Sequence, residues 1–587
     1  MNNRFLYILF KKKIGLPFGD KLLSVIRSFG VTEKIFFYTF FGILIFSVLS
    51  LLYNVSESFM VDVPAYGGTL TEGILGNPRF INPILANGDA SFDLSTLIYS
   101  GLMKRNSDGN LIPDLAESYE ISADGLTYTF TLKPNLTFHD GEKVTADDVI
   151  FTIVSAQDPG LKSPRRPNWE GVMVEKINDL TLKISLKTAY APFLENTTIG
   201  ILPKHIWQNL SIDDFPFSSG NTEPIGSGPY KFGSYKRSSS GAPISYELKS
   251  FKGYALGRPY IDNLSIKFYN NETDLLSALS KKEIDSAGGI SPEKAKGLIE
   301  SNTKIVRTTL PRVFAVFLNQ NEAPLFANKE VRQALETAID KDIIVQNVLL
   351  GFGRTLNGPI PPSLIPFQSE NDKQMNPFNV TKIIEAQNLL KNNGWKLSTT
   401  TRIFEKKIGK KIVTLSFSVS TSDAPELKAT AETLRSMWEK IGAKVDIKVF
   451  EAGDLNQNVI RTRKYEALLF GEIIGPDLDL FAFWHSSQRN DPGLNIALYA
   501  NIKTDKLLEE ARTTSDREKR LKDIQDFSLE ITKDRPALFL FAPDFIYALP
   551  DILSGVEIKN ITTPSDRFSN IKNWYLKTEK VWSIFSK

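Results

Sequence analysis

The side chains most often used in catalysis are few in this chain, and they are not grouped in known patterns. The chain has three histidines, His139, His205 and His485, and no cysteine. The histidines form neither H-E-x-x-H nor another metal-binding spacing, and without cysteine there is no thiol nucleophile, thiolate metal site or disulfide. Nucleophile-elbow, P-loop and dinucleotide-binding motifs are absent beside suitable elements. We therefore predict that the protein is not an enzyme and uses no catalytic residue, cofactor or metal ion.

Carboxylate pairs are the remaining candidates for acid–base chemistry. Asp147 and Asp148 are adjacent, and Asp477 lies two residues before Asp479. Such pairs are expected in a chain with 67 acidic residues, and their spacing alone does not give the geometry that paired-carboxylate catalysis requires. Thr145 precedes Asp148 by three residues, which is the spacing of a capping box. The first pair is therefore explained by the start of a helix.

The elements around that first pair have clear signatures. Leucine, tyrosine and phenylalanine alternate with threonine over residues 126–132, so a strand with one buried face is predicted. Asp124-Gly125 is typical of a tight turn that pairs this strand with the one through Tyr119 and Ile121. From about Lys329 onward, apolar residues at helical spacing alternate with strand-like runs at 413–419 and 445–450. That alternation indicates an α/β lobe.

The order of elements in residues 115–153 resembles the signature region of the bacterial extracellular solute-binding proteins of ABC importers. This family, family 5, contains the dipeptide- and oligopeptide-binding proteins. Each further segment is a weak match alone, but together they follow the family's order across about residues 66–550. They are Leu97–Leu102, Leu111–Glu117, Gly226–Phe232, Pro259–Asp262, Lys282–Asp285, Val331–Leu335, Ala338–Asp340, Gly358–Pro362 and Asn495–Tyr499.

The resemblance implies an α/β, bilobal periplasmic-binding-protein-like fold of the large, peptide-binding type. One lobe is built from both ends of the domain and the other is inserted between them, so two chain crossings form a hinge. We place lobe I at 65–311, lobe II at 312–541 and the return to lobe I at 542–587. The crossings are expected near Leu310–Ala315 and Leu538–Pro543.

The N-terminal region predicts a membrane anchor. Ile35–Tyr53 is a run of 19 residues without a charge. As a helix it covers ~28 Å, close to the hydrocarbon thickness of a bilayer. The tail before it, residues 1–34, has a net charge of +5, which favours a cytoplasmic tail and an outward-facing domain after a short linker at 54–64. The lack of cysteine excludes the lipidated cysteine that anchors many proteins of the family.

The alternative for this region is a cleaved signal peptide. Against it, the apolar run is longer than a typical signal core of ~7–15 residues, and no A-x-A site follows. Beyond Tyr53 the chain has 63 basic and 65 acidic residues, a net charge of −2. The positive net charge of the whole chain therefore comes from the N-terminal tail. We therefore predict no binding to nucleic acid.

The resemblance also implies a ligand held between two lobes that close by hinge rotation. In the peptide-binding members, a buried aspartate in a loop of the inserted lobe holds the ligand's amino terminus. The matching loop here is 469–481, and the aspartate is expected four residues after Gly471, where this chain has Gly475. A buried ammonium without a carboxylate costs on the order of several kcal/mol. Either a displaced acid takes the ammonium or the ligand has no free amino terminus.

The acids nearest to that position are Glu472, Asp477 and Asp479. We favour Asp477 as the displaced acid. Asp477 and Asp479 also precede a helix that is expected to enter at Leu480, so capping and ligand contact stay open for both. Further candidates follow from the resemblance or from their position beside this loop. Glu72 and Asn77 are expected in the loop after the first strand, which faces the cleft in relatives, and Arg461 would meet a carboxylate. These further candidates are Glu72, Asn77, Arg461, Trp484, Asn495 and Tyr499.

The sequence therefore predicts a single-pass receptor of the cell membrane, with a cytoplasmic N-terminus and an extracytoplasmic binding domain. Its expected partners are a peptide or other small solute, the permease of an ABC importer, and the lipid bilayer through Ile35–Tyr53. Binding of a sugar or a metal chelate by the same fold is the alternative within the transport class. A sensory receptor with this fold and an enzyme acting in the cleft are the alternatives outside it.

Overall fold

The computed structural model describes residues 25–364 and 380–585. Its contacts divide the chain into two compact units. The first consists of Met1–Ala65 with Lys577–Lys587, and the second is Tyr66–Leu576. Of the predicted cytoplasmic tail, residues 1–24 lie outside the described residues. The predicted start of the binding domain near Tyr66 coincides with the start of the second unit.

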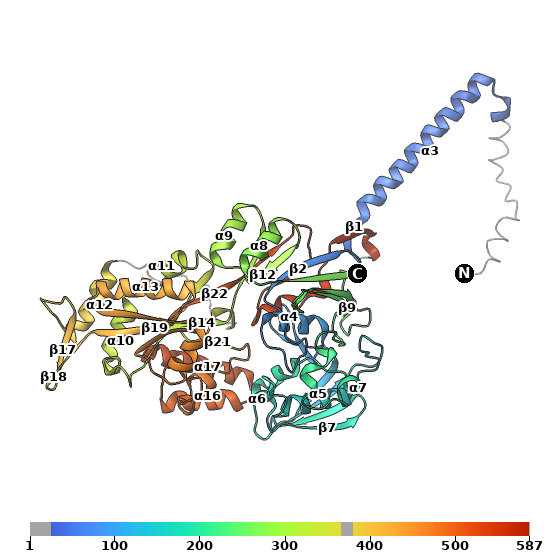
Figure 1. Ribbon diagram of the computed structural model, residues 1–587. Helices are drawn as coiled ribbons and strands as arrows, with labels where there is room; N and C mark the ends of the chain where they lie inside the picture. Colours follow the sequence, from blue (N-terminus) through green and yellow to red (C-terminus); the bar gives the residue numbers. More distant parts are fainter. Residues whose placement is uncertain (1–24, 365–379, 586–587) are drawn as a thin grey trace. The chain divides into compact units, whose positions relative to one another are not determined.

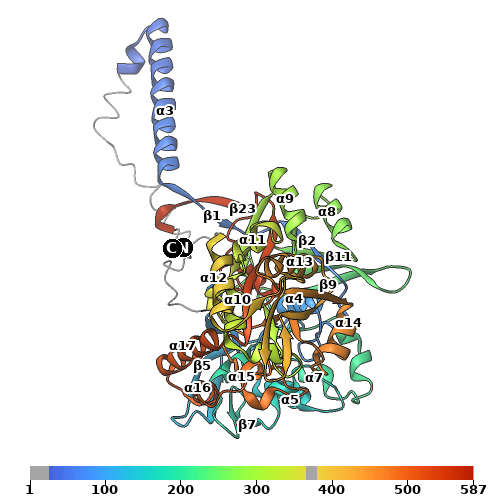
Figure 2. The same ribbon diagram turned by 90° about the vertical axis from the view of Figure 1, so that its left-hand side faces the viewer.

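Helix α3 (Val31–Phe59) and a two-stranded ribbon form the described part of the first unit. The predicted uncharged span lies inside α3, none of whose side chains is buried. Within the described residues, α3 is the one helix long and apolar enough to cross a membrane. Strand β1 (Met60–Ala65) follows directly and pairs with β23 (Lys577–Trp582), as Figure 2 shows.

The first unit corrects two predicted boundaries. Residues 54–64, expected to be a linker, are the last turns of α3 and strand β1. Residues 577–585, expected to return to lobe I, instead supply β23 and the short helix η11 (Ser583–Phe585). Local patterns missed this because β1 obtains its hydrogen-bonding partner from the opposite end of the sequence.

A mixed sheet of twelve strands runs through the second unit (Figure 1). The strand order is β20-β19-β21-β14-β22-β12-β2-β11-β10-β9, with β13 and β15 also paired to β22. The strands are β2 (Thr69–Leu75), β9 (Tyr230–Arg237), β10 (Pro243–Ser250), β11 (Asn263–Tyr269), β12 (Ser286–Gly288), β13 (Lys304–Thr309), β14 (Arg312–Leu318), β15 (Gly353–Thr355), β19 (Ser416–Ser422), β20 (Lys444–Phe450), β21 (Ala467–Ile473) and β22 (Ala537–Leu549).

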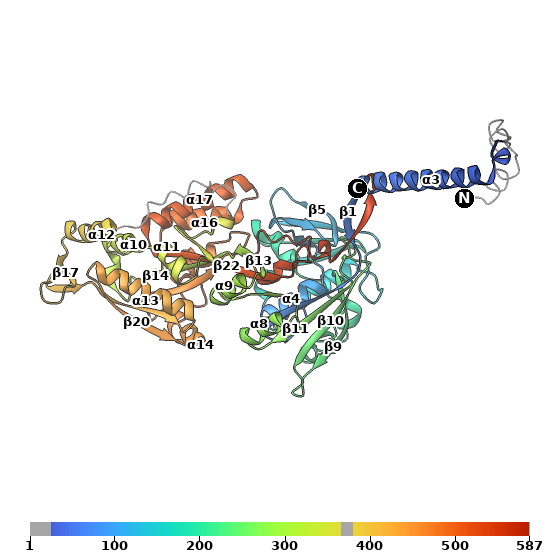
Figure 3. The ribbon, with the colours of Figure 1, turned by 90° about the horizontal axis from the view of Figure 1, so that it is seen from above.

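Strand β22 belongs to both halves of this sheet. Its first residues pair with β14, and its residues from Asp544 onward pair with β13, so one strand of 13 residues passes from one half to the other (Figure 3). The expected crossing at Leu538–Pro543 lies in the middle of this strand. The lobe boundaries at 311 and 541 stay predictions, because β22 continues unbroken past the second of them.

The apolar cores are distributed over the two lobes. The largest core takes its residues from 70–310 and 545–574, which we call lobe I. Two further cores take theirs from 313–542, lobe II, and lie on opposite faces of the sheet. Val316 and Leu318 of β14 contribute to one of these cores, whereas Val313, Ala315 and Phe317 contribute to the other. This period of two is what a strand covered on both faces requires.

Helices supply the cover on each face of lobe II. Residues of α10 (Lys329–Thr337), α12 (Val380–Asn392) and α13 (Pro425–Lys440) belong to the first core. Residues of α15 (Phe481–Trp484), α16 (Ile502–Thr513) and α17 (Arg517–Asp534) belong to the second. The predicted α/β character of this region is confirmed. The strand expected at 413–419 is two strands, because β18 (Lys411–Thr414) joins a small sheet with β16 (Lys396–Leu397) and β17 (Phe404–Ile408), and β19 joins the large one.

Lobe I contains a second sheet and the helix predicted beside it. The sheet has the order β5 (Ala116–Ile121), β6 (Thr127–Leu132), β8 (Thr181–Ser185), β7 (Met173–Asn178). Ile121 pairs with Tyr128, and burial alternates along β6, so the predicted hairpin is confirmed. Helix α5 (Ala146–Gln157) begins after the predicted capping box. The other helices of eight or more residues in lobe I are α4 (Asp89–Ile98), η1 (Ala191–Thr198), α8 (Glu272–Ser280) and α9 (Pro292–Glu300).

Candidate functional site

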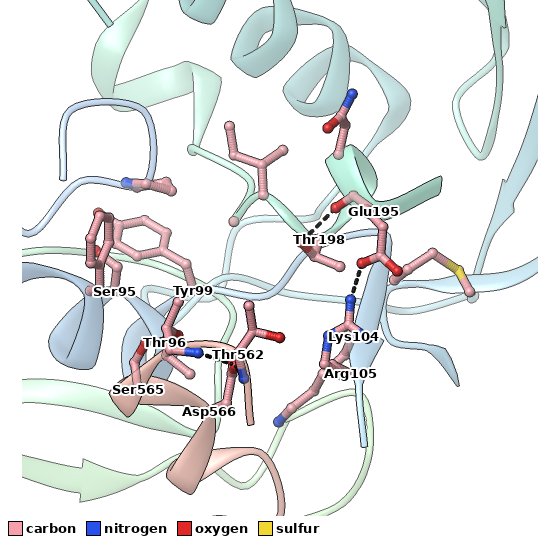
Figure 4. A pocket seen from close by; sticks show the side chains of 18 of the residues that line it. Ser95, Thr96, Tyr99, Lys104, Arg105, Glu195, Thr198, Thr562, Ser565 and Asp566 are labelled. Carbon is pink, nitrogen blue, oxygen red and sulfur yellow. Dashed lines mark hydrogen bonds and ion pairs between the residues drawn. The ribbon is translucent and has the colours of Figure 1, made fainter. Parts of the chain in front are cut away.

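A cavity of about 480 Å³ lies in lobe I and is the best candidate for a binding site. Its volume falls within the range of ~300–1,000 Å³ typical of ligand pockets. Lobe II contributes Pro476, from the loop after β21, to the lining. In Figure 4, Ser95 and Thr96 lie on one side of the cavity, and Arg105 and Glu195 lie on another. The cavity is therefore formed by lobe I and touched by one loop of lobe II.

Four elements of lobe I position the walls. Helix α4 places apolar residues such as Leu94 in the core and leaves Ser95 and Thr96 at the cavity. Strand β3 (Met103–Arg105) supplies Lys104 and Arg105, and η1 supplies Glu195 and Thr198. The short helix η9 (Pro564–Phe568) begins with a capping box between Thr563 and Asp566, both at the cavity. The walls thus come from segments more than 350 residues apart in the sequence.

One wall carries an ion pair that leaves no net charge. The Arg105 guanidinium donates to Glu195 Oε2 and to the carbonyl of Gly109. Burial raises the pKa of Glu195, and the charge of Arg105 opposes that rise. A half-buried arginine held on two acceptors is fixed in orientation, so this wall is preorganised.

A partly buried lysine, Lys104, and a buried aspartate, Asp114, also line the cavity. Lys104 Nζ donates to the Tyr254 hydroxyl at 2.9 Å. Burial raises the pKa of Asp114 and lowers the pKa of Lys104, and each charge opposes the shift of the other. Asp114 Oδ1 has no hydrogen-bond partner among the described residues. A buried oxygen of this kind offers a hydrogen-bonding position to a polar ligand or to water.

A further cation lies at the cavity. The guanidinium carbon of Arg165 is 5.2 Å from the centroid of the Phe92 ring, and both residues line the cavity. Burial lowers the pKa of Arg165. Stacking on an aromatic face leaves the in-plane N–H groups of an arginine free to point at an acceptor.

Lobe II meets lobe I beside this cavity through four residues that we call the interlobe cluster: Tyr190, Asp479, Phe481 and Arg512. The Tyr190 hydroxyl of lobe I donates to Asp479 Oδ2 at 3.0 Å, and Arg512 Nη2 is 3.1 Å from the same oxygen. The Arg512 guanidinium lies over the rings of Tyr190 and Phe481, at 5.1 and 4.4 Å. The hydrogen bond from Tyr190 and the stacking of Arg512 on its ring therefore join the two lobes at one point, and the ion pair within lobe II holds Asp479 and Arg512 together there.

The loop of lobe II that was predicted to bind the ligand is part of this contact. Gly475 and Asp477 flank Pro476, which lines the cavity. Burial, followed by the charge of Asp479, raises the pKa of Asp477 to about 6. A Cβ atom on Gly475 would lie 2.4 Å from Asp477 Oδ1. The family's aspartate at position 475 would therefore require the Asp477 side chain to move, so the two positions compete for one space.

Both aspartates of this loop also make local contacts. Asp477 Oδ1 accepts from the amide of Asp479, and Asp479 Oδ1 accepts from the amide of Phe481, each at 3.3 Å. The second of these reaches the first residue of α15. A local hydrogen bond to the start of α15 and a contact across the lobes thus coexist at Asp479, although the N-cap residue of α15 is Leu480.

Glu72 is held in an ion network of lobe I that we call the lobe I cluster: Glu72, Asp93, Tyr547, Arg567 and Phe568. Arg567 binds Glu72 Oε1 at 3.0 Å and Asp93 Oδ2 at 2.6 Å. The Tyr547 hydroxyl donates to Glu72 Oε2 at 2.7 Å. The Glu72 side chain is fully buried.

Trp484, Asn495 and Tyr499 make contacts inside lobe II. Trp484 is buried and packs near Phe317. The Asn495 amide donates to the carbonyls of residues 484, 485 and 499, which fixes the turn between them. The Tyr499 hydroxyl donates to Asp534 at 2.6 Å. These contacts fix the shape of the loop region behind the site.

The remaining three candidates lie in different surroundings. Asn77 is exposed and donates to Asn270. Arg461 forms a two-point ion pair with Asp491 at the surface. Glu472 is buried in β21, burial raises its pKa well above the usual range, and both its carboxyl oxygens are unpartnered within the described part of the chain.

None of the ten predicted site residues is among the residues found to line the cavity within the described part of the chain. Gly475 and Asp477 come nearest, because they are the sequence neighbours of the lining residue Pro476. As ligand contacts, all ten stay predictions. Sequence reasoning missed Tyr190, Arg512 and the polar walls from β3, η1 and η9. Arg512 faces Asp479 only because α16 packs beside α15, and no local pattern signals that.

Known proteins resemble this chain over most of its length. Residues 110–492 match the model of the bacterial extracellular solute-binding proteins, family 5, middle part. The oligopeptide-binding protein AppA of Bacillus subtilis is 31% identical over 530 residues, covering 89% of this chain and 94% of AppA. Its solved structure, in complex with a nonapeptide, covers 88% of this chain and 100% of that one with a TM-score of 0.65.

Two further solved structures have similar folds. The ABC transporter substrate-binding protein CtaP of Listeria monocytogenes is 27% identical, covering 87% of this chain and 99% of its own, with a TM-score of 0.72. NikZ of Campylobacter jejuni, in complex with Ni(L-His), is 29% identical, covering 86% and 99%, with a TM-score of 0.67. The bilobal α/β fold implied by the resemblance is thereby confirmed. The chain belongs to the bacterial extracellular solute-binding proteins of family 5.

Proposed function

We propose that this protein is the membrane-anchored receptor of an ABC importer and that it binds peptides between its two lobes. The cavity of lobe I, with Pro476 of lobe II at its edge and the interlobe cluster beside it, is the observation that carries this proposal. A ligand there would touch both lobes, and closure would bury it. The family consists of solute-binding proteins, and the oligopeptide-binding relative is similar over nearly its whole length.

The anchor and orientation form part of the same proposal. Helix α3 is long and apolar enough to span a bilayer, and the basic residues precede it. Positive flanks stay in the cytoplasm, so the second unit would face outward and deliver its ligand to a permease in the same membrane. Protease protection in sealed vesicles tests the orientation.

Thermal unfolding of the full-length chain in lipid nanodiscs tests the ligand class. A cognate peptide at 100 times its dissociation constant stabilises the folded state by ~2.7 kcal/mol. We expect a rise in the melting temperature with oligopeptides of several sequences. The reason is that the cavity walls carry polar groups and separate charged side chains rather than a pocket shaped for one side chain. A broad peptide library without effect, combined with stabilisation by another solute, would refute peptide binding.

Within this proposal, Asp477 takes the ammonium group of the peptide. Its carboxyl group lies next to the lining residue Pro476, where the family's aspartate is replaced by Gly475. We expect Asp477→Asn to weaken binding of peptides with a free amino terminus by about tenfold, which is ~1.4 kcal/mol, and to leave N-acetylated peptides unaffected. Calorimetric titration measures both.

The matched control is Asp454→Asn, which removes an exposed aspartate of the same lobe. Equal weakening of free and acetylated peptides by Asp477→Asn would show that Asp477 does not bind the ammonium. The ligand would then have no amino-terminal contact at this loop.

A metal chelate is the second candidate ligand, favoured by the similarity to NikZ, which was solved with Ni(L-His). No group of three or more metal-ligating side chains occurs within residues 25–364 and 380–585, so such a ligand would bring its own donors. Adding the nickel–histidine chelate to the thermal assay separates the two candidates.

A further inference from the structure

The C-terminal strand returns to the end of the membrane helix. Strand β1 begins at Met60, directly after the last residue of α3, and β23 runs antiparallel to it. The register pairs Met60 with Trp582, so β23 ends where β1 begins. Lys580 Nζ forms an ion pair of 2.6 Å with Glu57 Oε2 in the last turns of α3. The C-terminal segment therefore lies beside the base of the helix (Figure 2).

This end of the ribbon carries exposed apolar side chains. Trp582 is 44% exposed, Ile584 is 73% exposed and Phe59 is 55% exposed. The other six tryptophans of the chain, all within the described residues, are buried. A single exposed tryptophan at the base of an apolar helix is therefore an exception in this molecule.

The position of these side chains matches the interface of a bilayer. Phe59 is six residues beyond Tyr53, the end of the predicted span, so the ribbon starts ~9 Å outside the hydrocarbon core. The headgroup region adds ~5–8 Å on each side of that core, so the ribbon starts at its outer edge, within reach of a long side chain that points back along the helix. Tryptophan is enriched there because its ring is amphipathic, and Lys580 on Glu57 neutralises the first acid beyond the span.

We propose that the C-terminal end of β23 is a second membrane contact, in which Trp582 and Ile584 enter the headgroup region of the bilayer that α3 crosses. The proposal rests on α3 spanning the membrane. Continuity with that span identifies the bilayer as the occupant of this surface, because the surface begins at the residue where the helix ends. The chain is then held at the membrane by residues from both ends of its sequence.

Fluorescence quenching by brominated lipids tests this contact. The full-length chain is reconstituted in vesicles of phosphatidylcholine brominated on its acyl chains, and its tryptophan emission is compared with that in unbrominated vesicles. We expect a quenched fraction that disappears in Trp582→Phe, because the other six tryptophans are buried in the second unit. Bromine in both leaflets makes the result independent of orientation.

A matched control uses the opposite end of the same ribbon. Lys577 is exposed and pairs with Ala65, five residues from Trp582, or ~17 Å along the strand. The double variant Lys577→Trp with Trp582→Phe is expected to show less than half of the original quenching. Two outcomes would overturn the proposal. One is equal quenching in the natural chain and in the double variant, and the other is that Trp582→Phe leaves the quenching of the natural chain unchanged.

Flotation of the vesicles separates this result from the anchor itself. A chain that does not float with the vesicles has no membrane span, which overturns the anchor and the second contact together. A chain that floats without quenching of Trp582 keeps its anchor and loses only the second contact.

Discussion

The lobe I cluster and the interlobe cluster use the same chemistry in different places. In each, an arginine lies between two aromatic rings and binds a carboxylate that also accepts a tyrosine hydroxyl. The ring distances are 4.0 and 5.6 Å for Arg567 and 4.4 and 5.1 Å for Arg512. The arginine side chain is 3% exposed in the first cluster and 35% exposed in the second.

The difference shows how location sets the role of one arrangement. The lobe I cluster joins β2, α4 and η9 of a single lobe, so it breaks only when that lobe unfolds. The interlobe cluster joins Tyr190 of lobe I to lobe II, so it breaks when the lobes separate. In the buried lobe I cluster, removal of one ion-pair partner leaves an unpaired buried charge and costs much stability. In the interlobe cluster, solvent weakens the ion pair enough for the contact to break and re-form.

The largest expected effect is on the first cluster. Arg567→Ala leaves Glu72 and Asp93 buried without their cation and should cost about 3–5 kcal/mol of unfolding free energy. Arg512→Ala, the matched change in the interlobe cluster, should cost about 1 kcal/mol or less. Denaturant unfolding followed by circular dichroism measures both. Similar losses in the two variants would contradict the comparison.

A second effect concerns closure of the lobes. Tyr190→Phe removes the 3.0 Å bond across the lobes and should shift the population toward separated lobes by ~5-fold, the equivalent of ~1 kcal/mol. Since the natural chain has no cysteine, dyes on Lys252→Cys and Lys440→Cys report the distance between lobes by energy transfer.

The control for closure is Tyr547→Phe, which removes the corresponding bond within lobe I. It should lower stability without changing the energy transfer. A change in transfer with Tyr547→Phe, or none with Tyr190→Phe, would show that Tyr190 and Asp479 do not hold the lobes together.

A third effect is a pH dependence. Burial raises the pKa of Asp93 to about 6, against the opposing charge of Arg567, and burial with the charge of Asp479 raises the pKa of Asp477 to about 6. In both cases the folded state holds a proton more tightly than the unfolded state, so stability from these groups falls as pH rises from about 4 to 6.

An asparagine variant of each acid removes this pH dependence. At pH 7 both carboxyl groups are ionised above their raised pKa values, so Asp477→Asn should raise the melting temperature by about 2 °C. Asp93→Asn should raise it by less, because that change also removes one carboxylate partner of Arg567. Melting curves between pH 4 and 8 give the comparison, and equal rises in the two variants would show that the two acids have equivalent surroundings.

Local sequence determined much of the fold. The hairpin at 116–132 follows from alternating residues and Asp124-Gly125, and α5 follows from the capping box at Thr145. The apolar run at 35–53 predicted α3, and the order of short segments indicated the family. Each of these signals lies within a few residues of the element that it predicts, so no knowledge of packing was required.

Tertiary structure alone decided which charged residues meet. Glu72 was expected in the loop after the first strand, whereas it lies inside β2 and is buried. Both faces of β2 are covered, so alternation could not show that its carboxylate binds Arg567, 495 residues away. Tyr190 meets Asp479 across 289 residues, and β1 finds β23 at the far end of the chain. Such contacts depend on strand register and on the packing of distant helices, and these are set by the whole core rather than by neighbouring residues.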